Sequence, residues 1–216
     1  MENGVNIDEL RENLIKNNPV AREKDFKVVD YEDGVSLTRY KGKNGTLIIH
    51  GVSLTRYKGK NETLIIPEKI NGKRVIAIHS RFFRKNNRKI KNIILPNGIK
   101  YIDDNAFNVP AFLPNTGGIS DFEYIHLPES ITSIGEGAFS TCRRLNKINI
   151  PESVISIGSN AFSDCYSLKK INIPESVTTI GRTAFPFGCE INISKENKNY
   201  SFCDGFLVDK TNEILV

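Results

Sequence analysis

A short unit occurs three times in the C-terminal half of the chain, and it constrains the fold more than any other feature. Leu-Pro-Glu-Ser at 127–130 returns as Ile-Pro-Glu-Ser at 150–153 and again, at the same interval, at 173–176. An Ile-Gly step and an Ala-Phe pair follow each copy at constant distances. One such unit cannot bury its own apolar side, so successive copies must stack and share a continuous core.

Within one unit, short segments have the apolar spacing of strands. Leu145, Ile148 and Ile150 place apolar groups on one side of an extended segment, and the proline that follows ends it because it lacks an N–H. Two irregular units begin near residues 66 and 95. We therefore predict a mainly β chain of about five stacked rungs, with a spine formed by Phe83, Phe107, Phe139, Phe162 and Phe185.

The repeated unit resembles the BspA-like branch of the leucine-rich-repeat family. The matching pattern is Leu/Ile-Pro-x-Ser-Ile/Val-x-x-Ile-Gly-x-x-Ala-Phe-x-x-Cys-x-x-Leu-x-x-Ile-x-Ile, which is read from Leu127 to Ile173. The resemblance covers about residues 66–192 closely and extends more loosely to residues 199–207. The resemblance implies a curved leucine-rich-repeat solenoid that binds another protein. It also implies an adhesin-like role, in which a cell-surface protein binds host matrix. It implies no catalytic residues.

The N-terminal region differs in composition from the repeats. Residues 6–18 have the pattern of a short amphipathic helix, with Asn6 and Glu9 as a capping pair. We expect this helix to cover the first rung, because the exposed core at the end of a repeat stack needs a polar cover; a helix that docks a partner is the alternative. The chain then divides into a helical cap or leader (1–25), a strand-rich segment (26–66) and the solenoid (67–216), which ends in an irregular hairpin.

A 17-residue segment, residues 34–50, repeats almost unchanged as residues 51–67. The copies differ only at Gly45/Glu62 and His50/Pro67, and each reads as strand, Lys-Gly-Lys-Asn turn, strand. Seventeen residues are few for a complete turn of the stack, so we predict a hairpin added to the start of the sheet. Because the copies are nearly identical, the sequence specifies the register there only weakly.

Positive charge is concentrated in one part of the chain. The net charge is +5, yet residues 34–100 carry 16 basic and 2 acidic side chains. Such a block creates a local positive potential that could contact an acidic glycan, a nucleic acid or an anionic membrane surface, although a solvated lysine-rich face is the simpler interpretation. The candidate polyanion-binding residues are Lys73, Arg74, Arg81, Arg84, Lys85, Arg88, Lys89 and Lys91.

A second candidate surface lies between the inward-facing residues of the repeated strand. Side chains that alternate with the core positions point outward and form a ladder across successive rungs. A protein partner could bind this stripe, or its residues could simply face solvent. We expect their replacement by alanine to leave folding intact. The candidate partner-binding residues are Tyr124, His126, Lys147, Asn149, Lys170 and Asn172.

Little in the sequence points to chemistry. Cys142 and Cys165 occupy the same slot of consecutive units and read as small buried hydrophobic residues. The chain has no Cys-x-x-Cys pair, Gly-rich phosphate loop or Ser/His/Asp order, so we expect no metal, no cofactor and no enzyme. No apolar run is long enough to cross a membrane. The N-terminus lacks a signal-like segment, which favours the cytoplasm, whereas the family resemblance favours the cell surface.

Overall fold

The computed structural model describes most of the repeat region and part of the N-terminal region. The residues described are 7–18, 20, 26–31, 51–57, 62–70, 72–80, 82, 90–108, 122–203, 205–212 and 214–215.

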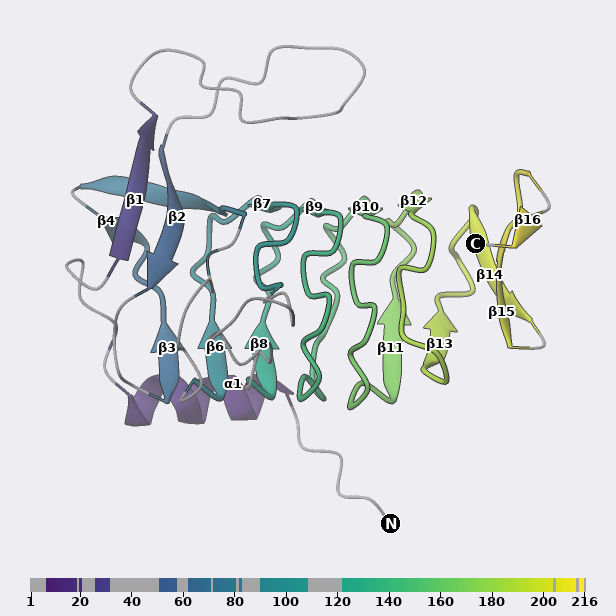
Figure 1. The fold of residues 1–216 in the computed structure, drawn as a ribbon, viewed down its shortest axis with the longest axis horizontal. Coiled ribbons are helices and arrows are strands. Elements are labelled where there is room, and N and C mark those ends of the chain that lie inside the picture. The colour runs from purple at the N-terminus through teal and green to yellow at the C-terminus, as the bar shows by residue number, and fades with distance from the viewer. Residues whose placement is uncertain are drawn as a thin grey trace, which may run out of the picture.

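The repeats form two parallel sheets on opposite sides of the stack (Figure 1). Sheet A follows the order β1-β2-β5-β7-β9-β10-β12, with β4 paired to β5. Its strands are β1 (Phe26–Tyr31), β2 (Gly51–Tyr57), β4 (Lys69–Ile70), β5 (Lys73–Ile78), β7 (Tyr101–Ile102), β9 (Ser133–Ile134), β10 (Ser156–Ile157) and β12 (Thr179–Ile180).

Sheet B contains the other strand of each turn. Strands β3, β6 and β8 pair in parallel, as do β11 and β13, and a bridge between Tyr124 and Lys147 continues the series. These strands are β3 (Thr63–Ile65), β6 (Asn92–Ile94), β8 (Tyr124–His126), β11 (Lys170–Ile173) and β13 (Glu190–Ile193). The prediction of a mainly β chain built from stacked repeats is confirmed.

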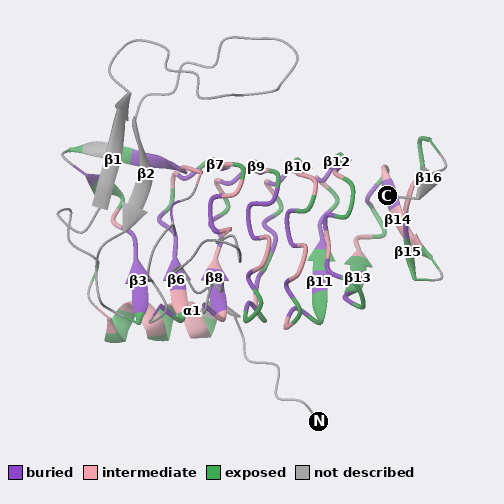
Figure 2. Cartoon of the chain, viewed as in Figure 1, coloured by how far each residue is buried: buried purple, intermediate pink, exposed green. Residues whose placement is uncertain are grey.

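The strand register equals the sequence repeat. In sheet A, Ser156 pairs with Ser133 on one side and with Thr179 on the other, so each step along the sheet is one full repeat. Equivalent residues of successive units therefore lie side by side, and the apolar ones form one buried core. Figure 2 shows buried positions recurring along the stack.

A column of phenylalanines occupies the centre of this core. Phe107 and Phe139 stack with their ring centroids 5.0 Å apart, Phe139 and Phe162 at 5.2 Å, and Phe162 and Phe185 at 6.0 Å. The predicted spine is confirmed over these four residues.

The first member of the column differs from the prediction. Phe82, not Phe83, contacts Phe107, edge-on at 6.0 Å, and Phe83 lies outside the described residues. The reason is a difference in spacing: Phe82 follows the inward residue Ile78 by four positions, whereas Phe107 follows Ile102 by five.

Glycine is required where successive turns approach most closely. Gly135, Gly158 and Gly181 occupy the same slot of three units. A Cβ on Gly158 would lie 2.5 Å from the backbone N of Glu136 and 2.6 Å from the carbonyl C of Gly135. These contacts are with backbone atoms, which cannot move without separating the turns.

Replacement of Gly158 by alanine is therefore expected to destabilise the protein by about 1–3 kcal/mol, the usual cost of overpacking. Urea unfolding followed by circular dichroism measures this change. The neighbouring Ser159→Ala provides the control, because its side chain forms no hydrogen bond recorded in the described part of the chain. Equal stability of the two variants would show that the turns separate easily.

The second copy of the duplicated segment does not form the predicted hairpin. The first copy, residues 34–50, lies outside the described residues. In the second copy, β2 pairs antiparallel with β1 and parallel with β5, whereas β3 pairs with β6 in the opposite sheet. This division buries Leu64 and Ile66 in the main core, which an isolated hairpin could not do.

Helix α1 (Ile7–Asn17) forms as predicted but in a different place. Its Leu10, Leu14 and Ile15 pack against the outward side of sheet B, not against the end of the first rung. Figure 1 shows the helix crossing β3, β6 and β8. Eleven residues span about 16 Å, which is enough to cross three strands spaced about 4.8 Å apart. The predicted cap residue Asn6 lies outside the described residues.

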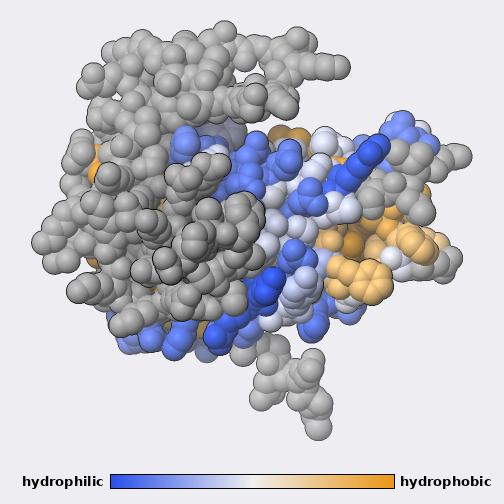
Figure 3. Space-filling model, in the orientation of Figure 1, coloured by the Kyte–Doolittle hydropathy of each residue, from blue (hydrophilic) through white to orange (hydrophobic). Residues whose placement is uncertain are grey.

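An antiparallel sheet follows the last repeat. It contains β14 (Tyr200–Cys203), β15 (Phe206–Asp209) and β16 (Ile214–Leu215), in that order. The β15–β16 pair is the C-terminal hairpin. The surface in Figure 3 is mostly hydrophilic over the middle turns, and apolar side chains gather at this end beside β14 and β15. Phe187 and Phe206 are among the exposed apolar residues.

Two buried side chains close the end of the stack. In earlier turns a serine hydroxyl donates to a carbonyl of the preceding turn, as Ser176 does to Val154 at 2.8 Å. After the last turn, Asn197 Nδ2 donates instead to the carbonyls of Pro174 (2.9 Å) and Val177 (3.0 Å). The Tyr200 hydroxyl accepts the N–H of Ile180 at 2.9 Å.

Candidate binding surface

The outward residues of sheet B form two rows along the stack. The strand register aligns Thr63, Asn92, Tyr124 and Lys147 in the first row, and the repeat continues it through Lys170 to Glu190. The second row contains Ile65, Ile94, His126, Asn149, Asn172 and Asn192.

The two rows differ between the first three turns, which α1 covers, and the later turns. Ile65, Ile94 and Tyr124 belong to the first three turns and are covered by α1. From the fourth turn onward the outward residues are polar, and none of them belongs to the apolar cluster against which α1 packs. We call the polar part the open face: Lys147, Asn149, Lys170, Asn172, Glu190 and Asn192.

The predicted stripe lies in these rows, with one correction. Tyr124 is only 2% exposed because α1 packs over it, so the prediction of a solvent-facing tyrosine is wrong. Its replacement by alanine would remove part of the helix contact and would not be neutral for folding. His126 and Lys147 are half-buried, whereas Asn149, Lys170 and Asn172 are exposed.

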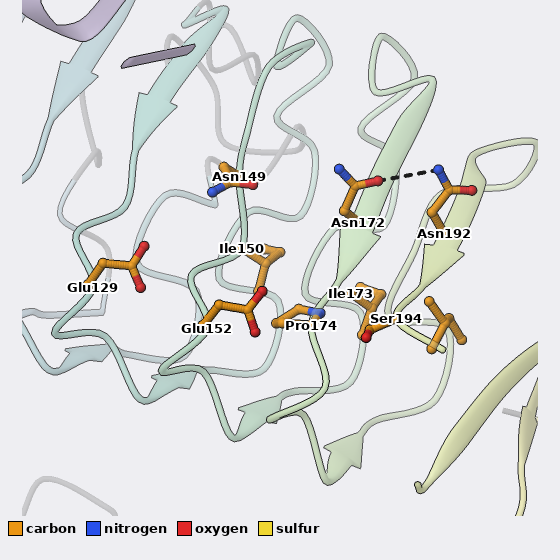
Figure 4. A pocket seen from close by; sticks show the side chains of 10 residues that line it. Glu129, Asn149, Ile150, Glu152, Asn172, Ile173, Pro174, Asn192 and Ser194 are labelled. Carbon is orange, nitrogen blue, oxygen red and sulfur yellow. Dashed lines mark hydrogen bonds between the residues drawn. The ribbon is translucent and has the colours of Figure 1, made fainter. Parts of the chain in front are cut away.

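An open hollow of about 340 Å³ borders the open face (Figure 4). The side chains of Asn149, Asn172 and Asn192 come from three successive strand positions, and Glu129 and Glu152 come from the turns beside them. The remaining lining residues are Ile150, Ile173, Pro174, Ile193 and Ser194.

Hydrogen bonds link the last two turns of this surface. Lys170 Nζ lies 3.0 Å from Glu190 Oε1. In the orientation drawn in Figure 4, Asn192 Nδ2 donates to Asn172 Oδ1 at 3.3 Å. With the amide turned over, Asn192 accepts from Lys170 Nζ at 2.8 Å and donates to Glu190 Oε1 at 3.2 Å, and this orientation is better because both its bonds involve charged partners.

The acidic residues differ in their partners. Glu190 pairs with Lys170, and Glu123 pairs with Arg144 at 2.7 Å. Glu129 and Glu152 are exposed, and neither forms an ion pair or side-chain hydrogen bond with any residue the structure describes. The hollow therefore contains two carboxylates without a countercharge from the described part of the chain.

Sequence reasoning missed three of the residues around the hollow. Asn192 could have been predicted from the sequence, because Ile-Asn-Ile occurs at 148–150, 171–173 and 191–193. Glu129 and Glu152 belong to the Pro-Glu-Ser motif, whose proline and serine have structural roles. The constant glutamate between them was the available signal.

The predicted polyanion-binding block lies mostly outside the described residues. Arg74 is exposed, and Lys91 is exposed and pairs with Glu62 at 3.0 Å. The backbone of Lys73 lies in β5, and its side chain is not described. Polyanion binding stays a prediction for the whole block, of which Arg81, Arg84, Lys85, Arg88 and Lys89 lie outside the described residues.

The cysteines agree with their interpretation as small core residues. Cys142 and Cys165 are buried, and the Cys165 thiol donates to the carbonyl of Phe139 at 3.2 Å. Burial raises the pKa of the Cys189 thiol to about 11. Among the described residues, no group of three or more His, Cys, Asp or Glu side chains could hold a metal ion, and no helix is long and apolar enough to cross a membrane.

Several solved structures have a similar fold. A leucine-rich repeat protein from T. pallidum shares 26% sequence identity with this chain, at a TM-score of 0.61, over 80% of this chain and 69% of that one. A leucine-rich repeat protein from Bacteroides ovatus shares 28% sequence identity, with a TM-score of 0.53, over 76% of this chain and 41% of that one. The pneumococcal vaccine antigen PcpA shares 21% sequence identity, with a TM-score of 0.54, over 74% of this chain and 49% of that one, and this likeness concerns the fold alone. The chain thus spans less than half the length of the Bacteroides ovatus protein and of PcpA.

Comparison with curated proteins gives no match. The family model described as "BspA type Leucine rich repeat region" matches residues 58–114 and 117–205 in six copies, so it includes the turn that begins with β3. This match covers well over half of the chain. The chain belongs to the BspA-type leucine-rich repeat family.

Proposed function

We propose that this chain is a non-catalytic module that binds another protein through the open face. The observation that carries the proposal is the end of the α1 cover after the third turn, where the outward residues become polar. The helix satisfies the apolar part of sheet B and leaves the polar part accessible. Repeat proteins use extended surfaces of this kind for recognition.

The proposal includes an adhesin-like role, with a partner on host matrix or on another cell. Membership in the BspA-type family supports this role, because the family resemblance implies surface proteins that bind other proteins. The open face also suits such a partner, since exposed amide and charged side chains can form hydrogen bonds without burying a large apolar area.

The experiment compares two sets of alanine replacements. In the first, Asn149, Lys170 and Asn172 on the open face are replaced together; in the control, Thr178 and Thr179, exposed beside and within β12 of sheet A, are replaced. Biolayer interferometry measures binding to an immobilised, solubilised basement-membrane preparation. We expect the open-face variant to bind about tenfold more weakly, which is the effect of losing a few moderate contacts, and the control to bind as the unmodified chain does.

Both variants should unfold at the same temperature as the unmodified chain, because all five side chains are exposed. Unchanged binding by the open-face variant would place the contact elsewhere, and failure of the unmodified chain to bind would contradict the host-matrix role.

A further inference from the structure

We infer that the hollow beside the open face binds a positively charged, extended peptide segment of the partner. This inference rests on the proposed function and adds the chemistry of the ligand to it. The first argument is the charge distribution. Two neighbouring acidic residues of this surface, Glu123 and Glu190, have basic partners, whereas Glu129 and Glu152 inside the hollow have none among the described residues.

The spacing of the two unpaired carboxylates strengthens this argument. Glu129 and Glu152 occupy the same slot of consecutive units, so their backbones are about one strand spacing, roughly 4.8 Å, apart. Like charges at equivalent positions of neighbouring strands repel each other. A cationic ligand would remove this repulsion and gain two charge-assisted hydrogen bonds.

The asparagines of the hollow suit a peptide main chain. Asn149, Asn172 and Asn192 lie in one row, and each amide offers both a donor and an acceptor. The N–H and C=O groups of an extended peptide need the same two functions along their length. Three turns of the stack span roughly 10 Å, which matches about three extended residues.

The base of the hollow suits the side chains of lysine or arginine. The apolar atoms that line the hollow come from the half-buried Ile193 and from the few accessible atoms of Ile150, Ile173 and Pro174. Lysine and arginine lay their aliphatic stems along such apolar atoms while the charged group stays with a carboxylate. An alternating basic segment would therefore use all three kinds of lining residue.

The test uses a fluorescein-labelled (Lys-Thr)4 peptide, with (Glu-Thr)4 as the probe of opposite charge. Fluorescence anisotropy measures the dissociation constant for the full chain, for Glu129→Gln/Glu152→Gln and for the matched control Glu136→Gln/Glu196→Gln. The control removes the same charge from two exposed residues outside the hollow. We expect the first variant to bind (Lys-Thr)4 roughly three- to tenfold more weakly and the control to change less than about twofold.

A charge reversal keeps the test decisive. Glu129→Lys/Glu152→Lys should lose (Lys-Thr)4 and gain (Glu-Thr)4, because the apolar and amide groups are unchanged. Equal binding of (Lys-Thr)4 by the glutamine variant and its control would overturn the inference, as would competition by a neutral N-acetylglucosamine hexamer, which would indicate a glycan ligand. Salt-sensitive self-association lost in the glutamine variant would indicate a second copy of the chain as the occupant and would likewise overturn it.

The outcomes also separate this inference from the proposed function. If the alanine variant of the open face loses basement-membrane binding but the glutamine variant keeps both activities, the binding surface stands and the basic ligand does not.

Discussion

Replacing Phe139 with alanine should lower the free energy of unfolding by about 3–5 kcal/mol. Phe139 is inaccessible to solvent and stacks between Phe107 and Phe162 at 5.0 and 5.2 Å. The substitution leaves a cavity in the middle of the column, and the paired sheets on either side prevent the turns from closing it. Urea unfolding, followed by circular dichroism, measures the loss.

Phe187→Ala is the matched control for this experiment. The same side chain is removed, but Phe187 is fully exposed, so the stability should change by less than about 0.5 kcal/mol. A similar, small effect of both substitutions would contradict the column as the centre of the core.

Replacing Asn197 with aspartate should cost about 2–4 kcal/mol, because buried polar groups lose their partners. Asn197 is 1% exposed, and its amide nitrogen donates to the carbonyls of Pro174 and Val177. A carboxylate cannot donate there and would place negative charge against both oxygens. Its oxygens would still accept the N–H groups of Asn199 and Tyr200, so the cost comes from the two lost donors and the added charge.

Asn146→Asp makes the same chemical change at an exposed residue whose side chain forms no hydrogen bond recorded among the described residues. Its thermal unfolding temperature should remain within a few degrees of that of the unmodified chain, as expected for a surface change below about 0.5 kcal/mol. If Asn197→Asp unfolds at the same temperature as Asn146→Asp, the end of the stack is held by other contacts.

The spacing of the repeats predicted the features that recur once in every unit. The constant spacing of the units sets the strand register, and the register determines that Phe107, Phe139, Phe162 and Phe185 form one column. These features follow from local spacing and parallel stacking, so they could be read from the sequence. The outward rows containing Asn149 and Asn172 could be placed for the same reason.

The non-repeating parts could not be placed in this way. The amphipathic pattern of α1 predicts an apolar stripe but does not specify which surface the stripe covers. The available signal was the outward row itself, because Ile65 and Ile94 stand where later turns have asparagine. Tyr124 was misassigned for the same reason, since its burial comes from the helix and not from its strand. Asn197 lies outside the repeated pattern, so no spacing in the sequence points to it. Its role becomes visible only when the structure places the carbonyls of Pro174 and Val177 beside its amide.

The boundary at which α1 ends separates the turns that hold the helix from the polar turns of the proposed binding surface. The helix matches a fixed number of apolar turns, whereas the polar turns that carry Asn149 and Asn172 are interchangeable increments of one repeat, each with its own amide and its own glutamate (Glu152 or Glu175). Duplication or loss of such an increment would lengthen or shorten the accessible area without disturbing the docked helix. In the proposed binding mode neighbouring subsites would act on one tethered ligand, so binding strength would rise with copy number through effective concentration. The architecture thus allows affinity to change through gain or loss of whole repeats, without changes to the residues that stabilise the N-terminal turns.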